Sequence, residues 1–332
     1  MEPVAVDVDD RRVLHALQLD GRASFARIAA TLGMSERTVS RRYHRLRCRL
    51  ALRVVGVTRP AAGEQEDWFL RVTAPSTSIE AVARRLAGRD DTSWIALLAG
   101  DGALTGILRV PAPTAPIGDR TGALEQLRRS ADIATVTAQR LLAPISSAGG
   151  SPGRLEALTA GEREALAPGT AVDRAAPPSA GHPLSDQDAR LLRLLASDGR
   201  TSNARLARAS GTSESTVRRR IAELTGSGML AFEVEVDSTR YGRQVDVLCW
   251  LDVQPAALGA VAAALGSHPE VAFAATTTGS TGLLALLELA DAGELHRYLV
   301  ERVAALPGVH RVRTDIVARW IKRAGPLGAV RG

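Results

Sequence analysis

Residues 20–46 read DGRASFARIAATLGMSERTVSRRYHRL, and residues 198–224 repeat them as DGRTSNARLARASGTSESTVRRRIAEL at a constant offset of 178. Fifteen of these 27 positions are identical without a gap, which indicates an internal duplication. Apolar residues recur at helical spacing near the end of each copy. They are Val39, Tyr43 and Leu46 in the first copy and Val217, Ile221 and Leu224 in the second. The duplicated stretch therefore predicts the same helical unit twice.

The residues before each of these apolar faces indicate how the helices begin and turn. Gly33 and Gly211 stand in a short turn, and serines stand where helix N-caps are expected. The cap positions are Ser24, Ser35, Ser202 and Ser213. We also expect Gly21 and Gly199 to end a first helix in the left-handed conformation. Two helices joined by a glycine-containing turn, the second with a basic outer face, are typical of a helix-turn-helix.

The outer face of the predicted second helix carries the candidate DNA contacts. In the first copy they are Ser35, Glu36, Arg37, Ser40, Arg41, Arg42 and His44, and in the second Ser213, Glu214, Ser215, Arg218, Arg219 and Arg220. Arginine can bond guanine at two atoms and so distinguish it from other bases. For any single helix, the alternative is that the basic residues form only a solvated helix face. Outward residues differ between the copies while inward ones match. Two different reading helices predict an operator with unequal half-sites.

Positive charge is concentrated on the duplicated segments. The chain has a net charge of +6; residues 1–60 hold twelve Arg against six acidic residues, and residues 185–228 hold eight against five. The rest of the chain is therefore net negative. Such a distribution is expected of a protein that binds phosphates at these two places.

A second pattern follows each helix-turn-helix. In the second half it reads strand, helix, two strands, helix, strand, over about 245–253, 256–266, 271–278, 283–289, 292–305 and 309–319. The first half follows the same order at an offset of 179. This order predicts a ferredoxin-like layer of helices on an antiparallel sheet. The fold class is α+β.

We expect four globular segments joined by a linker. They are a helix-turn-helix domain at 1–52, a divergent ferredoxin-like domain at 53–143, a linker at 144–184, a second helix-turn-helix domain at 185–230 and a second ferredoxin-like domain at 231–324. The linker is rich in Pro, Gly and Ser and contains a candidate short helix over 155–166.

The chain resembles the Lrp/AsnC (feast/famine) family of bacterial and archaeal transcriptional regulators. The resemblance lies in Asp-Gly-Arg-x-Ser-x-x-x-x-Ala, Gly-x-Ser and Thr-Val-x-Arg-Arg, followed by a βαββαβ unit. It implies two winged-helix-like helix-turn-helix units, each followed by a RAM-type ligand-binding and oligomerisation unit. The second half resembles the family throughout; the first half does so more weakly after Arg47-Cys48-Arg49-Leu50, where a glycine-containing turn is usual.

The resemblance also implies an effector site at the turn between the second and third sensor strands. Family members that sense amino acids carry a Gly-x-Tyr-Asp-like turn there, whereas neither turn of this chain has the aromatic residue or the following Asp. The candidate effector residues are Gly100, Asp101, Thr277, Thr278, Gly279, Ser280 and Thr281. An amino acid or another small effector is therefore expected, with its class left open.

The sequence shows no nucleophile elbow, metal-ligand spacing, phosphate loop or paired carboxylates, and no histidine cluster that recurs in both copies. We therefore expect no catalytic residues, no metal, no cofactor and no enzymatic activity. Two alternatives stay open. Sirohaem decarboxylases resemble the same fold, sometimes as fused two-copy chains, and a sensor or assembly protein would have vestigial DNA-binding units.

The expected partners are double-stranded DNA and a small effector. We expect the two sensor segments to pair with each other within the chain, and further homo-oligomerisation stays open. No apolar run is long enough to span a membrane, and the N-terminus lacks the features of a signal peptide. Cys48 and Cys249 are far apart in sequence and predict neither a disulfide nor a metal site. A reduced, cytoplasmic protein is expected.

Overall fold

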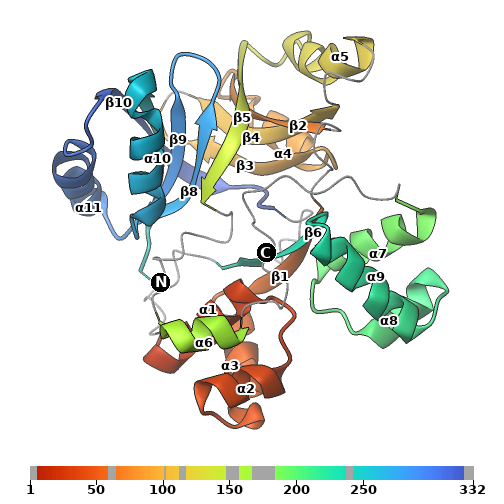
Figure 1. Cartoon of the computed structure of the whole chain (residues 1–332). Helices are drawn as coiled ribbons and strands as arrows, with labels where there is room; N and C mark the ends of the chain where they lie inside the picture. Colours follow the sequence, from red (N-terminus) through yellow and green to blue (C-terminus); the bar gives the residue numbers. More distant parts are fainter. Residues whose placement is uncertain are drawn as a thin grey trace. The chain divides into compact units, whose positions relative to one another are not determined.

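The computed structural model describes residues 6–58, 65–100, 102–111, 117–146, 157–166, 184–236 and 242–324 (Figure 1). The chain divides into two compact units, and each unit takes one segment from each copy of the duplication. The first unit comprises Met1–Ala61 and Pro152–Gly242, and the second comprises Ala62–Ser151 and Arg243–Gly332. The duplicated segments therefore associate like with like.

Two heads form the first unit. The first head contains α1 (Val8–Leu19), α2 (Phe25–Leu32), α3 (Glu36–Arg49) and β1 (Arg53–Thr58). The second head contains α7 (Asp186–Ser197), α8 (Asn203–Ser210), α9 (Glu214–Gly226) and β6 (Leu230–Glu235). The predicted inward residues of α3 and α9 are all buried, so the helical pattern and the two helix-turn-helix units are confirmed.

Strands β1 and β6 join the two heads as an antiparallel pair (Figure 1). Their register places Val55 opposite Glu233, and these two residues occupy the same position of the repeat at the offset of 178. The ladder is therefore centred on a pseudo-two-fold axis that relates the heads. The expected domain boundaries at 52/53 and 230/231 assigned both strands to the sensor segments, whereas the strands pair with each other in the first unit.

The linker contributes a helix to the first head. α6 (Ala160–Leu166) lies within the helix expected over 155–166, and it contacts α1 and α2. Leu158 and Leu166 are buried in the core of the first head, and Arg27 Nη2 donates to the Ala165 carbonyl at 2.8 Å. α6 is thus a packed part of that head, which the second head lacks among the described residues.

The second unit contains both sensor segments. The first is β2 (Gln65–Thr73), α4 (Ile79–Ala87), β3 (Thr92–Leu98), β4 (Ala103–Pro111), α5 (Ile117–Arg128) and β5 (Thr135–Ser146). The second is β7 (Val245–Val253), the 3-10 turn η3 (Pro255–Ala257), α10 (Leu258–Ser267), β8 (Val271–Thr277), β9 (Leu283–Leu289), α11 (Ala292–Arg297), the π-helical turn η4 (Tyr298–Val303) and β10 (Val309–Trp320). Both follow the predicted βαββαβ order.

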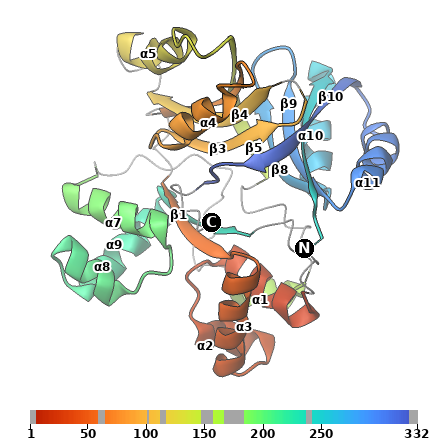
Figure 2. The ribbon, with the colours of Figure 1, turned by 180° about the vertical axis from the view of Figure 1, so that it is seen from behind.

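The two sensor sheets close into one barrel with the strand order β10-β3-β4-β2-β5-β8-β9-β7. The last strand of each segment pairs with the second strand of the other, as β5 with β8 and β10 with β3. Figure 2 shows the dark-blue β10 alongside β3. Each last strand also pairs with the first strand of its own segment, β5 with β2 and β10 with β7. The two last strands therefore join both segments into one barrel.

The barrel explains why β9 is buried at every position although antiparallel strands commonly alternate. One face of β9, with Leu283, Ala285 and Leu287, packs with residues of α10 and η4. The opposite face, with Leu284 and Leu286, packs against residues of the other sheet such as Phe69. Both faces are therefore core.

Candidate nucleic-acid interface

The turns predicted before the reading helices α3 and α9 are present in both heads. Gly33 and Gly211 have φ of 68° and 71°, in the left-handed region that favours glycine. Ser35 Oγ accepts from the Thr38 amide at 3.1 Å, and Ser213 Oγ accepts from the Thr216 amide at the same distance. Both serines therefore act as helix caps, which orients the first turn of each reading helix.

Most of the predicted contact residues face solvent. Exposed ones are Ser35, Glu36, Arg37, Arg41 and His44 on the first head and Ser213, Glu214, Ser215, Arg218 and Arg219 on the second, while Ser40 is half-buried. Arg219 Nη1 lies 3.3 Å from a carboxylate oxygen of Glu223, one helical turn away, in an exposed pair of small energetic weight. The two outer faces thus present different sets of donors to a partner.

Two of the predicted contact residues, Arg42 and Arg220, bond carboxylates of their own head. Arg42 Nη1 donates to Asp7 Oδ1 at 2.7 Å and to Asp10 Oδ1 at 2.9 Å, at the N-terminus of α1. Arg220 holds Asp188 of α7 through two bonds, from Nε at 2.6 Å and from Nη2 at 2.8 Å. These guanidinium groups tie each reading helix to the first helix of its head, and binding a phosphate would compete with those carboxylates.

The ion pairs lower the pKa of their carboxylates. Hydrogen bonds from Arg220, opposed by burial and assisted by Ser185, lower the pKa of Asp188 to about 2. For Asp7 burial acts in the raising direction, but hydrogen bonds from Arg42, the Asp10 amide and Arg45 lower the pKa to about 2. Both carboxylates are therefore charged near neutral pH.

The depressed pKa of Asp188 predicts an acid-sensitive second head. Because ionised Asp188 is favoured in the folded state, its stabilisation is complete above about pH 4 and is lost as the pH falls toward 2. We expect a loss of about 1–2 kcal/mol after allowance for solvent screening. Hydrogen exchange of α7 and α9 amides between pH 4.5 and 2.5 measures it. Asp188→Asn is the control, and equal pH dependence in both proteins would contradict the prediction.

The heads are held together by reciprocal hydrogen bonds as well as by the β1–β6 ladder. Arg22 Nη1 donates to the Gly199 carbonyl at 2.6 Å, and Arg200 Nη1 donates to the Gly21 carbonyl at 2.7 Å. Arg22 and Arg200 occupy the same position of the repeat, as do the two glycines. Arg200 also lies over the Phe25 ring at 4.7 Å, within the range of a cation–π contact. Each head thus supplies an arginine and an acceptor to the other.

The expectation that Gly21 and Gly199 end a helix in the left-handed conformation is wrong. Neither has positive φ, and the first helices end at Asp20 and Asp198 in extended backbone. Instead the heads approach so closely that a Cβ on Gly21 would lie 2.9 Å from Phe232 Cβ. Both glycines are therefore required by the contact between heads. Asp-Gly-Arg is identical in both copies, but that identity alone did not indicate a contact between the heads.

The predicted effector turn in the second unit is largely bonded within the protein. Thr277 Oγ1 donates to the Thr281 carbonyl at 2.7 Å, and Thr278 Oγ1 accepts from the Arg140 amide at 2.9 Å. The latter bond joins the turn to the other sensor segment. Gly100 is exposed with φ of 107°, and Asp101 lies outside the described residues. Among the described residues of this turn, Ser280 is exposed and presents its hydroxyl to solvent.

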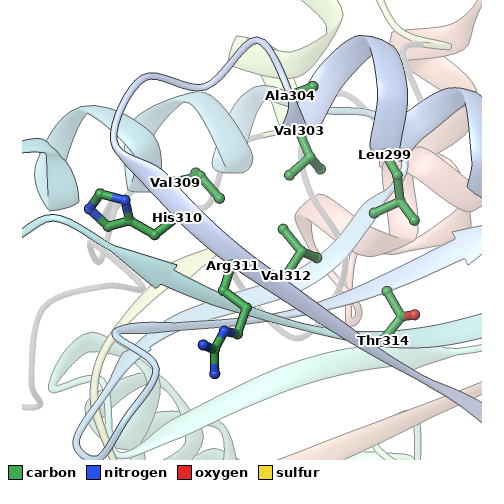
Figure 3. A pocket seen from close by; sticks show the side chains of 8 residues that line it. All are labelled: Leu299, Val303, Ala304, Val309, His310, Arg311, Val312 and Thr314. Carbon is green, nitrogen blue, oxygen red and sulfur yellow. The ribbon is translucent and has the colours of Figure 1, made fainter.

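A separate hollow of about 290 Å³ lies between η4 and β10 (Figure 3). Leu299 and Val303 on η4 and Val312 on β10 form its apolar wall, while the exposed His310 and Arg311 lie at its rim. π-helical turns such as η4 are frequent at functional sites. The sequence offered no sign of this hollow, because a π turn has no simple sequence pattern.

Two family models match the chain. The AsnC-type helix-turn-helix domain matches residues 6–47 and 184–225, and the Lrp/AsnC ligand binding domain matches residues 246–327. Over 141 residues the chain is 30% identical to an uncharacterized HTH-type transcriptional regulator of Pyrococcus horikoshii, a match that spans 41% of this chain and 89% of that protein. The chain belongs to the Lrp/AsnC family.

Other relatives agree with this assignment. The HTH-type transcriptional regulator FL11 of Pyrococcus horikoshii is 26% identical over 146 residues, which are 44% of this chain and 96% of FL11. Each such relative corresponds to about half of this chain. The Lrp/AsnC protein described here is therefore a tandem form of the family, with two helix-turn-helix domains and two sensor segments in one chain.

A likeness to solved structures over nearly the whole chain corrects an expectation. Among them is the siroheme decarboxylase NirDL, with a TM-score of 0.60, 12% identity and coverage of 95% of this chain and 92% of that one. The likeness shows a shared two-copy fold. The expectation of no enzymatic activity rests on a fold and motifs that indicate a regulator. That inference is wrong, because an enzyme has this same tandem architecture.

Two features are absent from the part of the chain that the structure describes. None of its helices is long and apolar enough to cross a membrane. Its residues include no group of three or more His, Cys, Asp or Glu side chains that would hold a metal ion.

Proposed function

We propose that this Lrp/AsnC protein is a sequence-specific DNA-binding regulator of transcription whose two heads read unequal half-sites. The observation that carries the proposal is that most of the divergence between α3 and α9 lies on their outer faces. Arg37, Ser40 and His44 in the first head correspond to Ser215, Arg218 and Ala222 in the second, whereas the buried residues keep their character. The two heads share one scaffold but have different outer faces. This difference favours recognition of a different base sequence by each head.

The chemistry of these faces supports base readout. Exposed arginines bond guanine O6 and N7 in the major groove, and residues at the N-terminus of a recognition helix are those that reach base edges. Arg37 and Arg41 lie in the first two turns of α3, and Arg218 and Arg219 lie at the corresponding height of α9. The pseudo-two-fold axis through the β1–β6 ladder gives the two half-sites opposite orientations.

Selection from random duplex DNA tests the proposal. The full chain is incubated with the pool at about 150 mM salt with competitor DNA, because phosphate contacts make affinity depend steeply on salt. We expect enrichment of an imperfect inverted repeat whose two arms differ. Enrichment of a perfect inverted repeat would refute unequal readout, and no enrichment above the starting pool would refute sequence-specific binding.

We propose further that the second unit binds a small effector within residues 246–327, the segment matched by the ligand-binding model. The turn around Ser280 and the hollow beside η4 both lie in this segment. Thermal-shift screening with amino acids and 2-oxo acids tests binding, and two variants locate it. Ala304→Arg fills part of the hollow with a long side chain, and Ser280→Ala removes the exposed hydroxyl of the turn. A ligand that shifts all three proteins equally would place the effector at neither site.

A second candidate function is decarboxylation of a sirohaem-type tetrapyrrole, favoured by the whole-chain likeness to NirDL. His268 and Tyr298 form a buried pair with 3.0 Å between Nδ1 and Oη, in the second sensor segment. Burial lowers the pKa of His268. Incubation of the protein with sirohaem, followed by absorbance spectra and product mass, tests this function. A mass loss corresponding to carbon dioxide would establish it, and an unchanged pigment without spectral shift would exclude it.

A further inference from the structure

The contact between the heads contains two sets of hydrogen bonds, beside the packing of β1 on α7 and of β6 on α1. The first is the six-residue ladder of β1 with β6, which by itself is a two-stranded ribbon. Such ribbons are marginally stable alone and vary widely in twist. A ribbon alone would therefore let the reading helices α3 and α9 change their mutual angle.

The second set lies in the loops that follow α1 and α7. Arg22 bonds the Gly199 carbonyl, the Thr201 carbonyl at 3.1 Å and Asn203 Oδ1 at 3.0 Å. Arg200 bonds the Gly21 carbonyl and, through Nη2, the Ala23 carbonyl at 3.0 Å. The acceptors of both arginines include equivalent backbone atoms of the opposite head. The pair is therefore a reciprocal clasp about the same pseudo-two-fold axis.

Both arginines are half-buried and already bonded to the opposite head. Both side chains are largely enclosed, and burial lowers the pKa of each guanidinium. Arg22 lies 5.6 Å from the centroid of the Phe232 ring, on the strand β6 that belongs to the ladder. Loss of either arginine would leave buried carbonyl groups without a donor, so the clasp is costly to open.

We propose that Arg22 and Arg200 are positioning residues that hold the two reading helices at one spacing and angle. The protein then accepts operators with a single separation of half-sites. The restriction to one separation of half-sites rests on the proposed DNA-reading function. The clasp itself is a property of the protein without DNA. The hydrogen bonds of the two arginines lie in the loops after α1 and α7, and they add to the packing of the strands in restricting the twist of the ribbon.

Distance measurement between spin labels tests the clasp without DNA. Labels are placed at Arg37→Cys and Ser215→Cys, which are exposed, equivalent positions of α3 and α9. Cys48→Ser removes the exposed native thiol, and Cys249 is 1% exposed and stays unlabelled. We expect one narrow distance distribution in the labelled full chain. In Arg22→Gln/Arg200→Gln the distribution is expected to widen at least about twofold, as the ribbon becomes free to twist.

Matched variants keep the test decisive. Arg190→Gln/Arg208→Gln removes two charges from exposed positions of the second head and is expected to leave the distribution narrow. Circular dichroism shows whether each variant is folded, and the single variants replace the double one if it is not. A folded Arg22→Gln/Arg200→Gln protein with an unchanged narrow distribution would overturn the proposal.

A second arm connects the clasp to DNA. Operators with one, two or three base pairs inserted between the half-sites are compared with the selected one. The parent is expected to lose at least about tenfold in affinity on insertion, and the clasp variant is expected to lose less because its heads adapt. Widened distances without any selective DNA binding would support the clasp and refute the proposed function. Equal insertion penalties in both proteins would refute the role of the clasp in spacing.

Discussion

The triple variant Arg37→Ser/Ser40→Arg/His44→Ala is expected to bind an inverted repeat of the second head's half-site in place of the unequal operator. These changes give the first reading helix the residues found at the equivalent positions of the second. Each lost bidentate contact to a base costs about 1–3 kcal/mol, and 1.4 kcal/mol is tenfold in affinity. We expect affinity for the original operator to fall about 10- to 100-fold, as measured by titration at fixed salt.

The same variant contains its own control. It removes one arginine and adds another, so the charge that determines non-specific binding is unchanged. We therefore expect unaltered affinity for random DNA and an unaltered dependence of that affinity on salt. A parallel fall in specific and random affinity would indicate a folding defect. If the variant still bound the unequal operator more tightly than the inverted repeat, these three positions would not read bases.

Replacing Gly21 or Gly199 by Ala is expected to destabilise the first unit and leave the second unaffected. A Cβ on Gly21 would lie 2.9 Å from Val54 Cγ1, and one on Gly199 would lie 3.1 Å from the Val54 carbonyl oxygen. Such overpacking costs about 1–3 kcal/mol. Hydrogen exchange followed by mass spectrometry resolves the two units. We expect faster exchange in peptides from both heads, because each glycine lies against Val54 of the first head and Phe232 of the second.

Two observations serve as controls for the glycine variants. A Cβ on Gly226 in α9 would meet no described atom within 4 Å, so Gly226→Ala is expected to be neutral or stabilising by up to about 1 kcal/mol. All four tryptophans lie in the second unit, so denaturation followed by tryptophan fluorescence reports that unit alone. Unchanged exchange in the Gly21→Ala heads would contradict the close approach.

Part of the candidate site was predictable because it depends on neighbours in sequence. The caps Ser35 and Ser213 and the left-handed Gly33 and Gly211 follow from local hydrogen bonding and backbone sterics. The role of Arg42 was not predictable from these rules. Its carboxylate partners lie more than 30 residues earlier in the chain, and a basic residue on a reading helix looks the same whether it faces DNA or another helix.

The sequence by itself determined the duplicated helix-turn-helix, the βαββαβ order and the unequal outer faces, because helix and strand periodicities and capping act over a few residues. Only the tertiary structure decided how the copies combine. The clasp between Arg22 and Arg200, the packing of α6 on the first head and the closed barrel join residues far apart in the chain. Such contacts depend on which surfaces meet in three dimensions, and one sequence contains no local signal for that choice.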